Sequence, residues 1–417
     1  MISVRNHQLR LNGNKWFVGL ALALLVGACT PKVRVLRGTG TSAPPETSKP
    51  ADQDPSAAGD NEEETVAVNN IALLLPFELD KANPHAPSTE DIKRSALALD
   101  FYQGFKLGLD ALAEKGTNFK VNVLDTRDDA GESARIAKQE EVQEAALVVG
   151  PVYPREIQVF GFNASLKDAL QVSPLAASMP SEFNLPNLVT LTAPITAHVQ
   201  ALAARIAEQY KPGDAVIFYQ TEDAAGKQFL SPLKMEIDRL NKGISVVEVS
   251  DGVELESRVH LSGKNLVVLA TTNKYEISPI LAELRRLNEE LSYQIELFGH
   301  PNWAKLGFGE SDGLAHFHTV ITSSYYVDHN RAEVSRFDEQ YRREFGIPAT
   351  EFAYKGYDAA YYFGGLLHEY GADYKDHLTE AKYKGLHNVF KFSYDAESGY
   401  VNNAVSILQY RNGHFQP

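Results

Sequence analysis

The strongest constraint on the fold is an unbroken alternation of strand-like and helical patterns from Ile71 to Phe298. The first run, 71–75, is wholly apolar, as is typical of a parallel strand that is buried on both faces. A predicted helix over residues 93–115 follows, and its apolar positions form one stripe: Leu97, Phe101, Phe105, Leu109 and Leu112. This alternation predicts an α/β protein with parallel sheets. About ten such units exceed what one compact sheet holds, so we expect two lobes.

The stretch from Leu147 to Ser178 predicts where a ligand site would lie. An apolar run ends at Gly150-Pro151, a helix follows, and a second run ends at Ser173-Pro174. Ligands of open parallel sheets bind beyond the carboxyl ends of the strands. We therefore expect the turns 150–155 and 174–179 to face one crevice, although either turn could simply connect its two elements.

The N-terminus has the pattern of a signal peptide over residues 1–28. A basic start precedes an apolar stretch, Trp16–Val26, which is too short for a stable membrane span. The sequence Leu25-Val26-Gly27-Ala28-Cys29 resembles the lipobox of bacterial lipoproteins, which implies cleavage before Cys29 and lipidation of that residue. Because Cys29 is the single cysteine, it has no disulfide partner. An ordinary secretory signal with an incidental cysteine is the alternative.

Residues 29–69 have the composition of a disordered linker, rich in Pro, Thr, Ser, Gly and Ala and without apolar periodicity. About forty flexible residues span roughly 35 Å on average. The predicted protein is thus a lipoprotein of the cell envelope, held to the periplasmic side of the outer membrane if the cell is Gram-negative. The net charge is −14, and removal of residues 1–28 takes away three cations and no acids, which leaves −17. Such a charge makes nucleic acid an unsuitable partner.

Several separated stretches resemble type I periplasmic ligand-binding proteins, the leucine/isoleucine/valine-binding family. The motifs that carry this resemblance are Tyr102-Gln103-Gly104-Phe105, Val148-Val149-Gly150-Pro151, Val172-Ser173-Pro174, and Phe337–Pro348 ahead of Gly356-Tyr357-Asp358-Ala359-Ala360. Near the C-terminus, the β-like runs Val389–Tyr394 and Ala404–Tyr410 predict a two-stranded antiparallel unit. The resemblance covers about residues 70–417.

The resemblance implies two Rossmann-like lobes joined by three crossovers and closing on ligand by a hinge. We place the crossovers near Ala193, Ser324 and Phe390. The first lobe would then comprise residues 70–192 and 325–388, and the second lobe residues 194–323 and 389–417.

The resemblance also implies a ligand-binding set in the cleft. In amino-acid-binding relatives the first lobe holds the ligand carboxylate, and the matching positions here are Gly150, Tyr153, Ala176 and Ser178. For the wall of the second lobe we expect Tyr219, Tyr275, His300 and Trp303. The family's acidic partners for the ligand ammonium would match Thr196 and His300–Asn302, and neither position has an acid. A free α-amino acid is therefore disfavoured, because a buried ammonium without a counter-charge costs several kcal/mol.

No catalytic motif, metal-binding motif or dinucleotide-binding glycine pattern is found, so we expect no enzyme activity, no cofactor and no metal. Two functions remain open. The first is a solute-binding lipoprotein that closes on a small polar ligand, either amino-acid-like or a peptide or cell-wall fragment, for an ABC permease or a sensor. The second is an outer-membrane activator of a peptidoglycan synthase, which would use the same fold as an interaction module.

Overall fold

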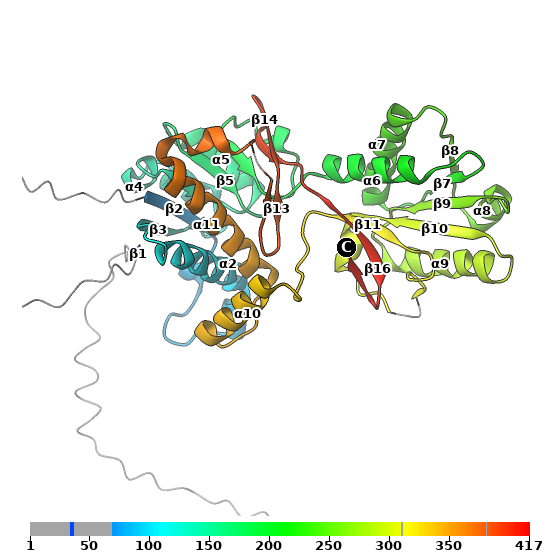
Figure 1. The fold of residues 1–417 in the computed structure, drawn as a ribbon. Coiled ribbons are helices and arrows are strands. Elements are labelled where there is room, and N and C mark those ends of the chain that lie inside the picture. Colours follow the sequence, from blue (N-terminus) through cyan, green and yellow to red (C-terminus); the bar gives the residue numbers. More distant parts are fainter. Residues whose placement is uncertain (1–33, 37–68, 310–311, 381) are drawn as a thin grey trace, which may run out of the picture.

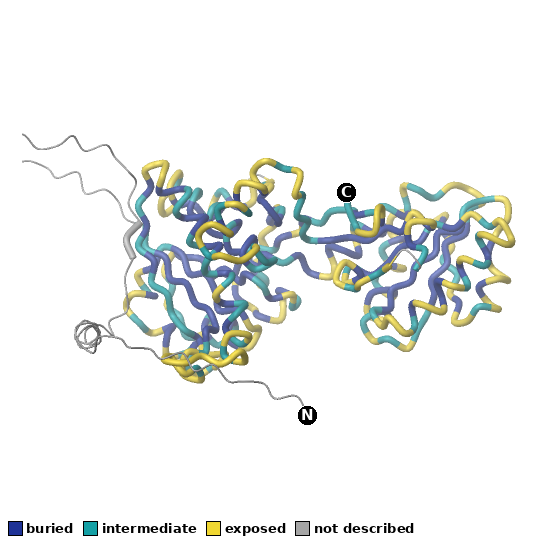
Figure 2. The backbone as a smooth tube through the Cα atoms, turned by 90° about the horizontal axis from the view of Figure 1, so that it is seen from below, coloured by how far each residue is buried: buried dark blue, intermediate teal, exposed yellow. Residues whose placement is uncertain are grey.

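The chain forms two α/β lobes, as the alternating pattern predicts, and three connecting segments join them, as the resemblance implies (Figure 1). The computed structural model describes residues 34–36, 69–309, 312–380 and 382–417. The predicted signal peptide and Cys29 lie outside the described residues. In Figure 2 each lobe has its own buried interior, and a narrow waist separates the two. None of the helices in the described ranges is both long and apolar enough to cross a membrane.

Lobe 1 is built on an eight-stranded sheet of order β1-β3-β2-β4-β5-β6-β15-β14. Its strands are β1 Arg34–Leu36, β2 Asn69–Leu75, β3 Phe119–Asp125, β4 Leu147–Val149, β5 Leu170–Ser173, β6 Leu188–Thr190, β14 Phe392–Asp395 and β15 Gly399–Asn402. Its helices are α2 Thr89–Ala113, α3 Ala130–Ile136, α4 Glu140–Gln143, α5 Pro154–Asn163, α10 Ala332–Phe345 and α11 Glu351–Tyr370. Short 3-10 turns η1 Leu79–Lys81, η2 Pro180–Glu182 and η5 Gly371–His377 and a small hairpin, β12 Tyr383–Lys384 with β13 Val389–Phe390, complete the lobe.

Lobe 2 has a seven-stranded sheet of order β17-β16-β11-β10-β9-β7-β8. Its strands are β7 Ala215–Tyr219, β8 Val246–Val249, β9 Lys264–Leu269, β10 Gln294–Gly299, β11 Val320–Ser323, β16 Ser406–Arg411 and β17 His414–Gln416. Its helices are α6 Ile195–Gln209, α7 Ala224–Leu240, α8 Gly252–Arg258 and α9 Lys274–Glu289, with the 3-10 turn η3 Pro301–Lys305. Strands β8, β7, β9, β10 and β11 run parallel to one another, as the alternation of strands and helices predicts.

The core of lobe 1 depends on a close crossing of α2 and α11, which lie side by side against the sheet (Figure 1). A Cβ atom on Gly104 would stand 1.8 Å from the carbonyl oxygen of Ala353, and one on Gly356 would stand 2.1 Å from that of Phe101. Because only glycine lets the two backbones approach so closely, the glycines of two resemblance motifs have a packing role. The predicted stripe of α2 faces this core, with Phe101, Phe105, Leu109 and Leu112 buried.

The third crossover differs from the predicted one. The chain passes to lobe 2 between Asn402 and Ser406, whereas the prediction placed the crossing near Phe390. The hairpin β14–β15 stays with lobe 1, where Tyr400 and Val401 of β15 pair in parallel with β6. The predicted pairing of 389–394 with 404–410 is therefore wrong, since β16 pairs instead with β11 and β17.

The predicted linker is also not wholly free. Strand β1 pairs antiparallel with β3, with Arg34 opposite Val121 and Leu36 opposite Phe119. The prediction of a disordered linker over residues 29–69 is thus wrong for these three residues, because the otherwise open edge of the sheet offers them backbone hydrogen bonds.

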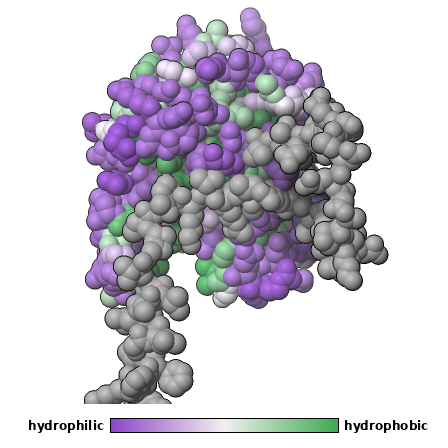
Figure 3. Space-filling view, turned by 90° about the vertical axis from the view of Figure 1, so that its left-hand side faces the viewer, coloured by the Kyte–Doolittle hydropathy of each residue, from purple (hydrophilic) through white to green (hydrophobic). Residues whose placement is uncertain are grey.

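Figure 3 views lobe 1 from its outer end, the side on which β1 lies. Where the described residues can be seen, this face is mostly hydrophilic.

Candidate functional site

A cavity of about 290 Å³ lies between the lobes, where the first two connecting segments pass. It is lined by Leu175, Ala177, Thr192, Ala193, Ile195, His198, His300, Pro301, Asn302, Lys305, Ser323, Ser324, Tyr325, Lys355 and Asn388. Apart from Asn388, which directly precedes β13, these residues lie at or just after the carboxyl ends of β5, β6, β10 and β11 or in the helical segments α6, η3 and α11. This is the expected position of a ligand in an open parallel sheet, and both lobes contribute to it. We call it the interlobe cavity.

Two lysines from opposite lobes meet at one side of this cavity. Lys355, on α11 of lobe 1, places its Nζ 2.6 Å from a carboxylate oxygen of Glu351. Lys305, from η3 of lobe 2, lies 3.8 Å from the same oxygen. Both ammonium groups also lie near the ring of Tyr325, at 5.3 and 5.6 Å from its centroid. Among the described residues, Glu351 is the only carboxylate that pairs with either lysine. Two ammonium groups thus share one carboxylate, which leaves one positive charge in excess.

Burial changes the acid–base properties of this cluster. It lowers the pKa of Lys355, a shift that Glu351 opposes and Lys305 reinforces. Burial also acts to raise the pKa of Glu351, but the charges of Lys355 and Lys305 outweigh it, and the pKa lies below its ordinary value. Glu351 therefore stays ionised and neutralises only one of its two cationic neighbours.

The histidines of the cavity add no charge at neutral pH. Burial lowers the pKa of His198 and of His300 to about 4. Nδ1 of His300 accepts a hydrogen bond from the backbone N–H of Asn302 at 3.1 Å, so its neutral ring carries the proton on Nε2. Nδ1 of His198 and the hydroxyl of Thr322 are hydrogen-bonded at 2.9 Å. The cavity therefore offers neutral hydrogen-bonding groups beside an excess of positive charge.

Of the predicted site residues, His300 alone lines the interlobe cavity. The turn after β5 contributes Leu175 and Ala177, while the predicted Ala176 is buried against Ile157 and Leu188. Ser178, which is half-buried, is not among the lining residues either. Residues Leu175 and Ala177 of the predicted turn thus line the cavity, whereas the predicted Ala176 and Ser178 do not.

The other first-lobe positions have structural roles. Gly150 has a φ of 103°, and a Cβ there would stand 2.0 Å from the carbonyl oxygen of Leu74. Its place at the end of β4 thus requires glycine. Tyr153 precedes α5 as its N-cap residue and is 37% exposed, outside the cavity lining.

The predicted second-lobe aromatic residues do not line the cavity. Trp303 is fully buried in the core of lobe 2, where its Nε1 donates to the carbonyl oxygen of Thr271 at 2.8 Å. Tyr219 is buried in the same core, and Tyr275, at the start of α9, is 92% exposed. The lining residues that sequence reasoning missed include Lys305, Tyr325, Lys355 and Asn388. The one sequence signal for the positive charge of the site was that the positions near Thr196 and His300, where relatives have acids, have none here.

The described residues contain no cluster of three or more His, Cys, Asp or Glu side chains suited to a metal ion. The lining of the interlobe cavity combines neutral hydrogen-bonding groups with two lysines, a composition that suits binding of a small polar ligand.

The two lobes, their three connections and a cavity between them define the type I periplasmic-binding fold. Solved structures with this fold match 84% of the chain. One is a putative branched-chain amino acid ABC transporter protein from Rhodospirillum rubrum, with 16% identity, 99% of that chain covered and a TM-score of 0.60. Another is a branched-chain amino acid ABC transporter periplasmic ligand-binding protein from Burkholderia xenovorans, with 12% identity, 94% covered and a TM-score of 0.54.

A third similar structure is an ABC transporter substrate-binding protein from Desulfitobacterium hafniense in complex with Leu, with 15% identity, 99% of that chain covered and a TM-score of 0.51. No protein-family model and no curated protein matches the chain. At these identities the likeness concerns the fold.

Proposed function

We propose that this chain is a non-enzymatic solute-binding protein that closes its two lobes on a small anionic ligand. The observation that carries the proposal is the meeting of Lys305 and Lys355, one from each lobe, over the single carboxylate of Glu351. A ligand carboxylate placed there neutralises the excess charge and bonds to both lobes, so it stabilises the closed form. The solved structures with the same fold include a substrate-binding protein in complex with Leu, which supports a role in solute capture.

We infer that the preferred ligand is a carboxylate without an α-ammonium group. An amino acid would bring a cation into a cavity whose one carboxylate is already engaged by two lysines. An unpaired buried ammonium costs several kcal/mol. The neutral groups His198, His300 and Asn302 suit hydrogen bonds to the rest of a polar ligand, such as a peptide or cell-wall fragment that ends in a carboxylate.

The place of action follows from the sequence signals. A lipid on Cys29 would hold the protein at the surface of a membrane in the cell envelope, where the captured solute would be passed to an ABC-type permease or a sensor. The alternative function, activation of a peptidoglycan synthase, is less well supported, because the similar solved structures are named as ABC transporter proteins.

A thermal-shift experiment tests the ligand class by comparing acids with their amino-acid counterparts. We expect 4-methylpentanoate to raise the unfolding midpoint more than leucine, and 3-phenylpropanoate more than phenylalanine. A ligand present at a hundredfold excess over its Kd stabilises the protein by about 2.7 kcal/mol. Small-angle scattering of the same samples should show a smaller radius of gyration with a bound acid.

Site variants connect the effect to the interlobe cavity. Lys355→Gln should weaken binding of the acids by about tenfold or more, because a hydrogen bond to a charged group contributes about 1.5–3 kcal/mol. Lys242→Gln, at an exposed position in the turn after α7, is the matched control and should leave binding unchanged. Stronger stabilisation by the amino acids would contradict the inferred ligand class. A cooperative melt that no carboxylate or amino acid shifts would contradict solute binding.

A further inference from the structure

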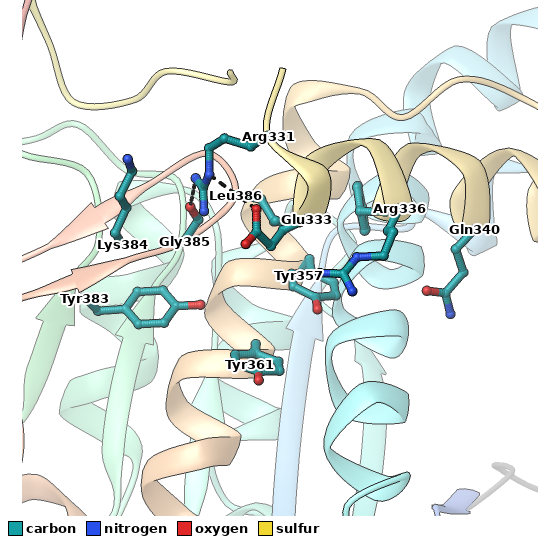
Figure 4. Close-up of a pocket in the computed structure, with 11 residues that line it drawn as sticks. Arg331, Glu333, Arg336, Gln340, Tyr357, Tyr361, Tyr383, Lys384, Gly385 and Leu386 are labelled. Carbon is teal, nitrogen blue, oxygen red and sulfur yellow. Dashed lines mark hydrogen bonds and ion pairs between the residues drawn. The ribbon is translucent and has the colours of Figure 1, made fainter. Parts of the chain in front are cut away.

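A second cavity, of about 340 Å³, lies in lobe 1 away from the interlobe cavity, between α10, α11 and the β12–β13 hairpin (Figure 4). We call it the arginine–tyrosine pocket. It is lined by Arg331, Glu333, Arg336, Phe337, Gln340, Tyr357, Tyr361, Tyr383, Lys384, Gly385 and Leu386. It shares no lining residue with the interlobe cavity, so the two can be tested separately.

The charges of this pocket are unbalanced in favour of cations. Arg331 is held in place, since one Nη donates to the carbonyl oxygen of Gly385 at 2.7 Å and its Nε lies 3.8 Å from the carboxylate of Glu333. Among the described residues, no hydrogen bond or ion pair engages the side chain of Arg336 or of Lys384, and both residues are exposed. Three cations thus face one carboxylate, in a chain whose net charge is −14. Figure 4 shows Arg336 reaching from α10 toward Tyr357 on α11.

The hydroxyl groups of the pocket are donors as well. Lys115 donates to the hydroxyl oxygen of Tyr361 at 2.6 Å, which leaves the proton of Tyr361 free to bond elsewhere. Burial raises the pKa of Tyr357 to about 12 and that of Tyr383 further, so both hydroxyls keep their protons. The pocket is therefore rich in donors and poor in acceptors.

Flat rings form much of the remaining lining. The rings of Phe337 and Tyr357 pack edge to face with centroids 5.0 Å apart, and those of Tyr357 and Tyr361 stack at 5.7 Å. A planar apolar group can lie along such rings while an attached acid reaches the guanidinium groups. The volume is at the lower end of small-molecule sites, so it suits one compact ligand.

We propose that the arginine–tyrosine pocket is a second binding site, which takes a small planar carboxylate between Arg336 and the tyrosine hydroxyls. The ligand carboxylate accepts from the guanidinium of Arg336 and from the hydroxyl of Tyr361, and its flat body lies against Tyr357 (Figure 4). This site is independent of the solute captured between the lobes.

Calorimetric titration of the whole chain with benzoate, benzamide and benzylamine tests the proposal, because these probes share one shape and differ in charge. Benzoate should bind at least tenfold more tightly than benzamide, and benzylamine should not bind. Arg336→Gln should weaken benzoate binding at this site at least tenfold, and Tyr361→Phe, which removes one hydroxyl donor, should weaken it severalfold. Two variants serve as controls. Lys355→Gln alters the interlobe cavity and Arg239→Gln alters an exposed surface, so both should retain benzoate binding in the arginine–tyrosine pocket.

Crystals soaked with 4-bromobenzoate locate the ligand directly through the anomalous signal of bromine, which should lie beside Tyr357. Equal binding of benzoate and benzamide overturns the proposal, as does unchanged affinity in Arg336→Gln. Bromine found only in the interlobe cavity, or binding of an acidic peptide without binding of benzoate, also overturns it.

Discussion

The buried carboxylate of Asp358 allows a quantitative test of how the fold is held together beside both cavities. Asp358 lies on α11 and is fully buried. It accepts the backbone N–H groups of three successive residues, Leu386, His387 and Asn388, at 2.7, 2.9 and 2.7 Å. Asp358→Ala removes every acceptor and leaves three buried N–H groups without partners.

The expected cost follows from these three groups. Each unsatisfied buried donor costs about 1–3 kcal/mol. Water that enters the space left by the carboxylate should recover part of this, so we expect a loss of about 3–6 kcal/mol in the free energy of unfolding. Because a whole domain is stable by only about 5–15 kcal/mol, the midpoint in a urea titration followed by far-UV circular dichroism should fall markedly.

Asp395 provides the matched control. Its exposed carboxylate also accepts backbone N–H groups, from Glu397 and Ser398 at 3.0 and 2.9 Å, but water can replace it there. Asp395→Ala should therefore cost less than about 1 kcal/mol. If Asp358→Ala costs no more than this control, the segment 386–388 does not depend on the buried carboxylate, and the reasoning is refuted.

Two further predictions concern packing and pH. Gly104→Ala should destabilise lobe 1 by about 1–3 kcal/mol or more, because its Cβ would collide with the backbone of Ala353. Gly365→Ala is the control and should be neutral or stabilising, because a Cβ there meets nothing within 4 Å. Equal effects of the two substitutions in urea unfolding would contradict the close crossing of α2 and α11. Acid should also destabilise the protein, because burial lowers to about 4 the pKa of three histidines, His198, His300 and His387. Their contribution is present above the unfolded-state pKa of about 6.5 and is lost as the pH falls toward 4, by about 3 kcal/mol per histidine. Unfolding curves between pH 7.5 and 4.5 measure this loss; His300→Gln should reduce it, and a stability independent of pH would show that these rings are not buried.

The two-lobed fold was predictable because it depends on local patterns. Apolar runs such as 71–75 and the stripe of α2 repeat with the periods of strands and helices, and the structure confirms both lobes. The third crossover was not predictable in this way. Residues 389–394 and 404–410 look equally strand-like. What separates them is long-range pairing: β14 and β15 form a hairpin that joins β6, and β16 joins β11, and both of these partners are far away in the sequence.

The cavity residues were harder to predict than the fold. Lys305 and Lys355 come from different lobes, and only the arrangement of the connecting segments brings them to the same carboxylate. The turn after β5 was recognised, but the alternation of its side chains was not, so Ala176 was chosen where Ala177 lines the cavity. Aromatic side chains gave a misleading signal, since the core of lobe 2 needs a large residue such as Trp303.

Strand β1 changes how the protein would stand on a membrane. Arg34 is already paired with the sheet of lobe 1, so four residues, 30–33, separate Cys29 from a fixed point on the globular body. At ~3.5 Å per residue the chain from Cys29 to Arg34 reaches about 17 Å. If Cys29 carries a lipid, the sheet edge of lobe 1 would be held close to the bilayer in a restricted range of orientations. Spin labels on the edge of lobe 1 would then lie nearer to the membrane than labels on lobe 2, whereas a free linker would give both the same distribution of distances.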